Sequence, residues 1–413
     1  MRYLIAATLI FCGQLVAAQP QKVTLEQAMN QAVQINKSIQ AADLGIEYQR
    51  QLKRTSTDIG KTNVVYMRGQ YNSFAKDDNN VTISQSIPFP TVFATQSKLN
   101  QSLIKGSELH KSTVQNELMY QVKQAFYELV YLKAKESLLR RQDSIYQNFA
   151  RAADARYRAG ETNLLEKTTA ETQSSEVTNK LNQTRADVTI YQQLLGTLIN
   201  NGMPMDAANE ILQEREFDLN ADTVLLKHNP QLAFLKQQTE IAEAERKVAG
   251  AKFLPDILVG YFNQTLIGTP ANSNGDLATH SDRFQGFEIG LSVPLWFGPQ
   301  SAKVKAASIN EQRAGSVYEY NQTILKGQWQ QAIQQYAKSK SSLAYYQTAA
   351  LQNAELILKQ SELAFRNGEI DYMEFLLSTR SAIQIRENFL ISLNDVNQSI
   401  IYLEFLAGSN NNQ

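Results

Sequence analysis

The sequence predicts a mainly α-helical protein in which tandem-duplicated long coiled-coil helices are joined to β-hairpins that suit a small membrane β-barrel. Three observations predict this fold class. Residues 91–203 and 300–413 contain no proline and carry apolar residues at heptad spacing. The segments between these stretches alternate polar and apolar residues, as β-strands do. Finally, motifs of the first half of the chain recur in the second half.

The chain begins with an expected signal peptide at residues 1–18. A basic start (MRY) is followed by an apolar run at 4–16 and by Val-Ala-Ala at 16–18, which fits cleavage before Gln19. The apolar run is shorter than the roughly 20 residues that span a bilayer, so we expect export rather than a membrane anchor. Cleavage would remove Cys12, the only cysteine, and would exclude disulfides and thiol chemistry from the mature protein.

Composition and motifs exclude several functions. Forty basic residues balance forty acidic ones, so the charge excess of a nucleic-acid-binding protein is missing. Phosphate-binding, dinucleotide-binding, zinc-protease and serine-hydrolase motifs are also missing. The three histidines, at 110, 228 and 280, are scattered without the spacing of metal ligands. We therefore predict no catalytic residues, no cofactor and no bound metal.

Two β-hairpins are expected. The strands of the first lie at about 62–73 and 80–88, and those of the second at about 255–266 and 284–294. The alternation predicts that Val65 and Met67 share one apolar face, as do Ile83 and Ile87, while Phe287 begins a similar series in the last strand. An apolar face opposite a polar face suits a strand between lipid and water. An ordinary solvent-facing sheet is the alternative.

The proline-free stretches predict long helices. Heptad spacing is carried by Leu118, Val122, Ala125, Leu129, Leu132 and Leu139 in the first, by Trp329, Ile333, Tyr336, Leu343, Tyr346 and Ala350 in the second, and by Ile383, Leu390, Leu393, Ile400 and Leu403 near the C-terminus. This is the narrow seam of a coiled coil. A helix over residues 91–155 would be about 100 Å long at 1.5 Å per residue.

The repeat divides the mature chain into residues 19–215 and 216–413. ISQSIP at 83–88 recurs as IGLSVP at 289–294, and YRAGE at 157–161 recurs as FRNGE at 365–369. Each repeat therefore predicts a helix, a hairpin, a long helix, a sharp reversal and a return helix. The reversals are expected near Gly160 and Gly368, because glycine accepts the left-handed conformation that ends a helix.

Four strands cannot close a barrel alone, because membrane barrels need about eight or more. Open sheet edges are not tolerated in lipid. Several copies must therefore complete the barrel, and the strand count alone allows either two copies with eight strands or three with twelve.

These features resemble the TolC-type outer-membrane efflux protein family. The resemblance is carried by HNPQL at 228–232, AKFLP at 251–255, SVPLWFG at 292–298, SIPFP at 86–90 and the two glycine turns. It covers nearly the whole mature chain. Asn36 departs from the pattern, since it is followed by Lys37 where Asn229 is followed by Pro230, and this leaves the first helix boundary in doubt.

The resemblance implies a homotrimeric α/β-barrel duct, with twelve strands in the bacterial outer membrane and a helical barrel in the periplasm. It implies a passive channel that conducts substrate from an inner-membrane pump of the RND type through a periplasmic adaptor protein to the exterior. In style the sequence is closest to the heavy-metal-cation branch typified by CzcC and CusC, although drugs or other small molecules remain alternative substrates. The competing hypotheses are an exported coiled-coil scaffold and an efflux adaptor, neither with a membrane barrel.

The resemblance also indicates candidate pore and gate residues. It places Glu374 in an acidic ring at the closed end, with Asp371 three residues earlier and Glu166 at the matching position of the first repeat. A carboxylate ring would favour cations, whereas a solvated helix face is the alternative. Arg158 and Arg366, beside the tip-turn glycines, could tie helices together, contact the adaptor or be surface charges.

Overall fold

The computed structural model describes residues 20–70, 74–208, 211–216, 226, 228–271 and 274–409. The expected signal peptide therefore lies outside the described residues. The chain forms two compact units. We call the one made from residues 38–114 and 223–327 the sheet unit. The other, which we call the helical unit, is made from the described parts of residues 1–37, 115–222 and 328–413. Long helices run through both units, and the sheet unit also contains β-strands. The predicted fold class is therefore confirmed.

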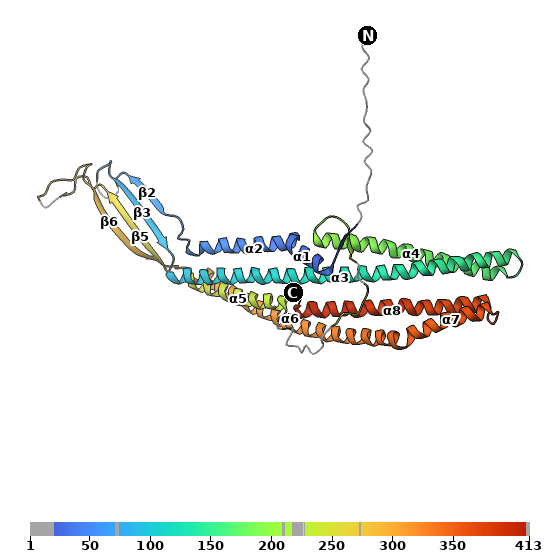
Figure 1. Cartoon of the computed structure of the whole chain (residues 1–413). Coiled ribbons are helices and arrows are strands. Elements are labelled where there is room, and N and C mark those ends of the chain that lie inside the picture. Colours follow the sequence, from blue (N-terminus) through green and yellow to red (C-terminus); the bar gives the residue numbers. More distant parts are fainter. Residues whose placement is uncertain are drawn as a thin grey trace, which may run out of the picture. The chain divides into compact units, whose positions relative to one another are not determined.

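The sheet unit contains one antiparallel sheet with the order β2-β3-β5-β6 (Figure 1). Its strands are β2 (Asn63–Arg68), β3 (Asn79–Ile87), β5 (Asp256–Gln264) and β6 (Phe284–Ser292). The strand predicted at 62–73 is too long. Gly69 has φ +133 and donates its N–H to the carbonyl of Asp78 at 2.8 Å, which starts the turn directly after Arg68. Residues 71–73 lie outside the described part of the chain.

The two faces of this sheet differ in polarity. One cross-strand row joins Val64, Ile83, Tyr261 and Phe287, all apolar or aromatic. The neighbouring row on the other face joins Asn63, Ser84, Gly260 and Glu288. Side chains alternate along a strand, so the second face is the more polar one, although it also carries Val65, Leu258 and Phe262.

The predicted orientation of the first strand is wrong. Val65 pairs with Thr82 and Met67 with Asn80, so both lie on the polar face. Val64 and Tyr66 are the residues on the apolar face, where each is more than half exposed. The prediction grouped Tyr66 with the polar residues of the strand. The strand is therefore shifted by one residue relative to the prediction, and such a shift moves every side chain to the opposite face.

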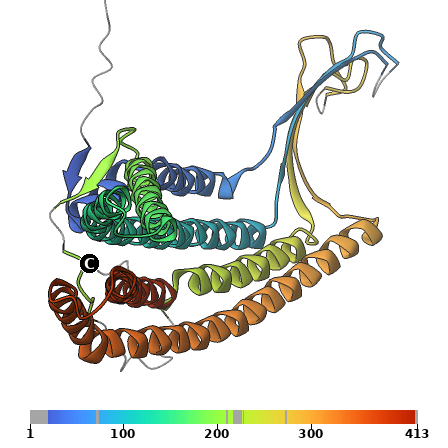
Figure 2. The same cartoon turned by 90° about the vertical axis from the view of Figure 1, so that its right-hand side faces the viewer.

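Four helices of the sheet unit lie side by side, and their order in space matches the order of the strands to which they connect (Figure 2). They are α2 (Lys37–Lys53), the first part of α3 (Pro90–Arg158), α5 (Pro230–Ala251) and the first part of α6 (Phe297–Tyr345). Ion pairs join the neighbours: Asp43–Lys111 at 2.6 Å links α2 to α3, Lys105–Glu240 at 3.7 Å links α3 to α5, and Arg246–Glu311 at 2.6 Å links α5 to α6.

The helix boundaries follow from local capping. Asn229 accepts the N–H of Leu232 at 3.0 Å, and Pro230 occupies the first turn of α5, where its missing donor costs nothing. At the matching place in the first repeat the chain breaks instead between α1 (Leu25–Ile35) and α2. Asn36 is extended there, and its side-chain amide donates to the carbonyl of Leu198 at 2.7 Å.

The helical unit is built from two antiparallel helix hairpins (Figure 1). The second part of α3 returns as α4 (Leu164–Ile199), and α7 (Leu351–Arg366) returns as α8 (Tyr372–Ala407). The predicted seam residues Leu118, Val122, Leu129, Ile400 and Leu403 are all buried. The heptad pattern therefore identified the packed faces of these helices.

Two features of the helical unit were not predicted. A π-helix, η3 (Tyr346–Ala350), interrupts the second long helix between α6 and α7, whereas α3 runs on without a break. The wider turn shifts the heptad positions after Tyr346. A short parallel pair, β1 (Gln21–Val23) with β4 (Met205–Ala207), lies beside α1 and α4. Three-residue strands give too short a pattern to detect.

A buried ion cluster fixes the segment that links the two repeats. Glu404 of α8 binds Lys123 of α3 at 2.8 Å and Arg215 of the linking segment at 2.6 Å. Arg215 also donates to the hydroxyl of Tyr127 at 2.9 Å, and its backbone N–H donates to Asn397 at 2.9 Å. The repeat junction is thus attached to both α3 and α8 within the helical unit.

Candidate functional site

The candidate site lies at the two helix turns of the helical unit. Gly160 has φ +76 between α3 and α4, and Gly368 has φ +73 between α7 and α8. In each turn the next residue's N–H bonds back to a carbonyl five residues earlier, Glu161 to Arg156 at 2.9 Å and Glu369 to Ala364 at 2.8 Å. This bond and the left-handed glycine form a Schellman motif, which satisfies carbonyls left free at a helix end.

Asp371 and Glu374 form the start of α8. The Asp371 carboxylate accepts the N–H of Glu374 at 2.8 Å, and the Glu374 carboxylate accepts the N–H of Asp371 at 3.4 Å. This reciprocal capping box stabilises the first turn. Both side chains are nevertheless exposed, so one oxygen of each carboxylate can still meet solvent or an ion.

Glu166 occupies the matching position at the start of α4 but makes different contacts. Asn163 caps its backbone N–H at 2.9 Å. Its carboxylate accepts from Arg156 at 2.7 Å and from the hydroxyl of Thr162. Glu166 is therefore tied to the end of α3, and its side chain is mostly buried.

Within one copy, the ion pairs of the two predicted arginines stay inside their own helices. Arg158 pairs with Asp154 at 2.8 Å and Arg366 pairs with Glu362 at 2.9 Å, each within its own helix and largely exposed. Arg156 instead makes the bond between α3 and α4. Its counterpart in the second repeat is Ala364, so comparison of the repeats gave no signal for it.

A second link between α3 and α4 is the ion pair of Asp154 with Lys167 at 2.8 Å. The hydrogen bond from Lys167 holds the pKa of the Asp154 carboxyl below its usual value, with a smaller contribution from Arg158. Together with Arg156–Glu166, this pair closes the first hairpin next to its turn.

An aromatic cluster joins the second hairpin to the first. Tyr372 lies against Ala153 of α3 and Ala170 of α4, and its ring centroid is 5.9 Å from that of Phe149. Phe375 lies 5.1 Å from Phe149 and stacks on Phe365 at 4.8 Å. These contacts bring all four helices together at the tip. These contacts were not predicted, because the aromatic residues come from separate helices.

The hydroxyl of Tyr372 has an unusual environment. It is buried and has no hydrogen-bond partner among the described residues. The Arg156 guanidinium lies 5.9 Å from the centre of its ring. Burial raises the pKa of the Tyr372 hydroxyl, and the charge of Glu166 adds to the effect. Tyr372 therefore contributes packing rather than a polar tie.

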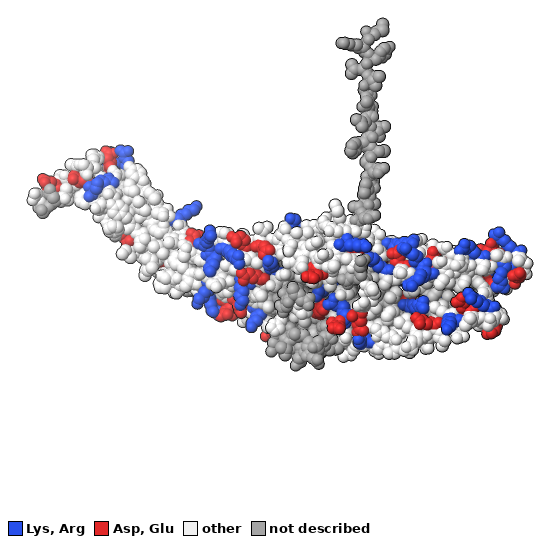
Figure 3. Space-filling model, viewed as in Figure 1, with Lys and Arg blue, Asp and Glu red and all other residues white. Residues whose placement is uncertain are grey.

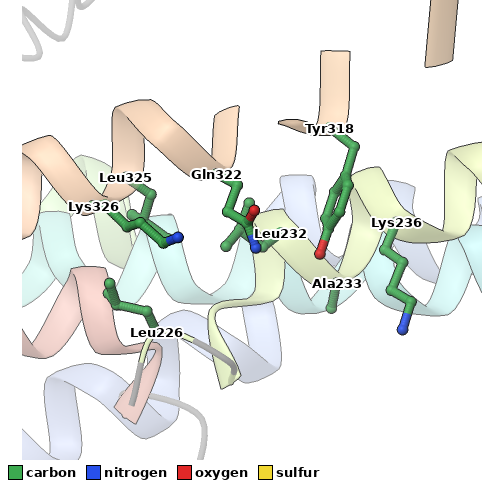
Figure 4. A pocket seen from close by; sticks show the side chains of 8 residues that line it. All are labelled: Leu226, Leu232, Ala233, Lys236, Tyr318, Gln322, Leu325 and Lys326. Atoms are coloured by element: carbon green, nitrogen blue, oxygen red, sulfur yellow. The ribbon is translucent and has the colours of Figure 1, made fainter. Parts of the chain in front are cut away.

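The tip as described holds helices together through ion pairs and aromatic contacts. Within the described ranges, no three His, Cys, Asp or Glu side chains gather as they would around a metal ion. None of the described helices is long and apolar enough to cross a bilayer. A groove of about 550 Å³ lies in the sheet unit, where Tyr318 and Gln322 of α6 face Leu232 and Lys236 of α5 (Figure 4).

Comparison with known proteins gives a consistent result. The family model described as "Outer membrane efflux protein" matches residues 16–201 and 223–409, which together make up most of the chain. None of the curated proteins matches.

Solved outer-membrane channels share the fold. The chain is 15% identical to the CmeC outer membrane channel of Campylobacter jejuni, with a TM-score of 0.78 over 94% of this chain and 86% of that one. It is 15% identical to the outer membrane protein VceC of Vibrio cholerae, with a TM-score of 0.74 over 93% of this chain and 96% of that one. It is 16% identical to the open MtrE channel of Neisseria gonorrhoeae, with a TM-score of 0.73 over 93% of this chain and 88% of that one.

Proposed function

The chain belongs to the outer membrane efflux protein family, and from this premise we propose that three copies form one passive duct across the bacterial outer membrane. The duct receives substrate from an inner-membrane pump through a periplasmic adaptor and releases it outside. No catalytic step is assigned to the chain, because transport through the duct needs only a continuous water-filled path.

The four-stranded sheet is the observation that carries this proposal. Its apolar face exposes Val64, Tyr66, Ile83, Val259, Phe287, Ile289 and Leu291. Figure 3 shows that Lys, Arg, Asp and Glu are almost absent from the visible surface of the sheet and gather at the hairpin ends. An apolar belt of this kind suits lipid, and the polar opposite face suits water.

The edges of the sheet favour association of several copies. β2 and β6 are each paired on one side only, and unpaired backbone groups in lipid cost several kcal/mol each. β2 and β6 run in opposite directions, since each neighbouring pair in the sheet is antiparallel. β6 of one copy can therefore continue the antiparallel pattern into β2 of the next. Three copies would close twelve strands. A scaffold without a barrel would leave these edges unexplained.

The gate is proposed at the helical tip. Closing of the duct would use the packing of Tyr372 against the first hairpin, together with the Arg156–Glu166 pair that closes that hairpin. Three copies would bring three Asp371 and three Glu374 carboxylates around the axis. Such a ring favours cations, which is compatible with a metal cation as substrate but does not require one.

Neutralising the tip carboxylates tests the acidic ring. Glu374→Gln keeps a side-chain acceptor for the capping box and removes three charges per duct. We expect single-channel recordings in a KCl gradient to show a reversal potential closer to zero, with unchanged thermal stability. Glu355→Gln, on the exposed part of α7, is the matched control. Equal cation selectivity in wild type and Glu374→Gln would rule out the ring.

A further inference from the structure

The more polar face of the sheet has a distinctive pattern on its edge strand β6. Three successive positions of β6 on this face are Gly286, Glu288 and Gly290. Glycine weakens a strand because it has no side chain to pack, so glycine in a strand often marks the close approach of another group. Glu288 lies between the two glycines. It is exposed and forms no ion pair or hydrogen bond with another described residue.

Side chains of the neighbouring strand β5 cover both glycines. A Cβ atom added to Gly286 would lie 2.6 Å from the ring of Phe262, so the tip of that ring occupies the space above the glycine. A Cβ atom added to Gly290 would lie 3.7 Å from the side chain of Leu258. Both side chains are only partly buried. The glycines therefore let two apolar side chains of β5 lie across β6 on either side of Glu288.

The Glu288 side chain reaches back over β5. Its partner across the strands is Gly260, and a Cβ atom added there would lie 3.3 Å from Oε2 of Glu288. Gly260 separates Leu258 from Phe262, and residues two apart on a strand are roughly 7 Å from each other. The carboxylate thus lies between an aromatic ring and an aliphatic side chain. We call Leu258, Phe262 and Glu288 the β5–β6 patch.

The β5–β6 patch carries a negative charge that no basic side chain neutralises. On this face of the four described strands, the only charged residues are Asp256 and Glu288. Asp256 lies at the end of the sheet next to the helices, where it accepts a hydrogen bond from the hydroxyl of Ser86 at 3.4 Å. Glu288 is therefore the single charged residue near the middle of the face.

This combination of groups suits an organic cation better than a metal ion. An aromatic ring attracts a cation through its quadrupole, and organic ammonium ions are recognised in this way. A metal ion such as Ca²⁺ needs several oxygen ligands, whereas the patch offers one carboxylate. Among the residues that the structure describes, no three His, Cys, Asp or Glu side chains come together. A carboxylate beside Phe262 instead matches an ammonium group with carbon substituents.

We propose that the β5–β6 patch is a weak binding subsite for organic cations inside the barrel. The subsite rests on the proposed function, because the polar face lines a duct only if several copies close the barrel. It deepens that function by naming a class of cargo. Three copies would carry three subsites at one level of the duct. Weak binding suits such a path, since a conducted molecule must also be able to leave.

Saturation-transfer difference NMR tests the subsite, because it detects weak ligands of large particles. The probe is benzyltrimethylammonium, added to the protein in phosphatidylcholine nanodiscs, with empty nanodiscs as the blank. Phe262→Leu should raise the dissociation constant roughly two- to fivefold, the factor expected for an exposed cation–π contact. Glu288→Gln should raise it by a similar factor, about that of an exposed ion pair.

Two variants serve as matched controls and should bind the probe as wild type does. Asp256→Asn removes the same charge from the same face at a distance from the ring. Phe287→Leu removes a ring from the apolar face of the same sheet, where Phe287 is 84% exposed. Benzenesulfonate, an aromatic anion, should give no signal above the blank.

Equal dissociation constants in wild type, Glu288→Gln and Phe262→Leu would overturn the subsite. It would also be overturned if Asp256→Asn weakened binding as much as Glu288→Gln, since the general charge of the face would then attract the probe. If such protein still forms a conducting trimer in a planar bilayer, the proposed function stands and only the subsite is wrong. A monomeric protein without conductance removes both.

Discussion

Replacing Glu404 by glutamine is expected to lower the free energy of unfolding by about 3–5 kcal/mol. Glu404 binds both Lys123 and Arg215, and all three side chains are more than four-fifths buried. Glutamine keeps the shape but removes the negative charge that both cations bind. Removing one partner from a buried ion cluster lowers the free energy of unfolding by more than the intact cluster adds to it, because the remaining charges are still out of water.

The measurement is urea unfolding of the purified protein in detergent, followed by circular dichroism. Glu362→Gln is the matched control, since Glu362 pairs with Arg366 on an exposed surface and such pairs contribute little. A Glu404→Gln variant as stable as Glu362→Gln would show that the cluster does not hold the repeat junction.

Truncating Tyr372 to alanine is expected to lower the free energy of unfolding by about 3–5 kcal/mol, as for other large buried aromatic side chains. The ring fills the space between Phe149, Ala153 and Ala170, so its loss weakens the packing of the second hairpin on the first. Because we place the gate there, we also expect a leaky duct. Cells should become sensitive to a large antibiotic that an intact outer membrane excludes.

Tyr372→Phe provides the control. The hydroxyl has no hydrogen-bond partner among the described residues, so its removal should be neutral or slightly stabilising, and the duct should stay closed. If Tyr372→Ala is destabilised but admits no more antibiotic than wild type, the cluster has only a structural role. If Tyr372→Phe leaks as much as Tyr372→Ala, the hydroxyl rather than the ring holds the tip.

The fold was predictable because it rests on local and repeated signals. Proline-free heptads identified buried positions such as Leu129 and Leu403, and the family resemblance is confirmed. The face of the first strand was not predictable, since Tyr66 is amphipathic and a short strand offers few residues to decide between two faces.

Tertiary contacts limited the prediction of the site. The family resemblance indicated Asp371 and Glu374 as pore residues, but the capping box that holds them also explains their types without a pore. Their pore role stays a prediction. Arg156, Phe149 and Arg215 act through partners on other helices, and a single sequence carries no pattern that pairs residues across helices.

The most direct test of a shared duct is the mass of the purified protein in mild detergent, determined by native mass spectrometry. The sheet of one copy has two open edges and four strands. We predict a particle with three chains that also conducts ions in a planar bilayer. A particle with one chain, stable in detergent and without conductance, would contradict the account.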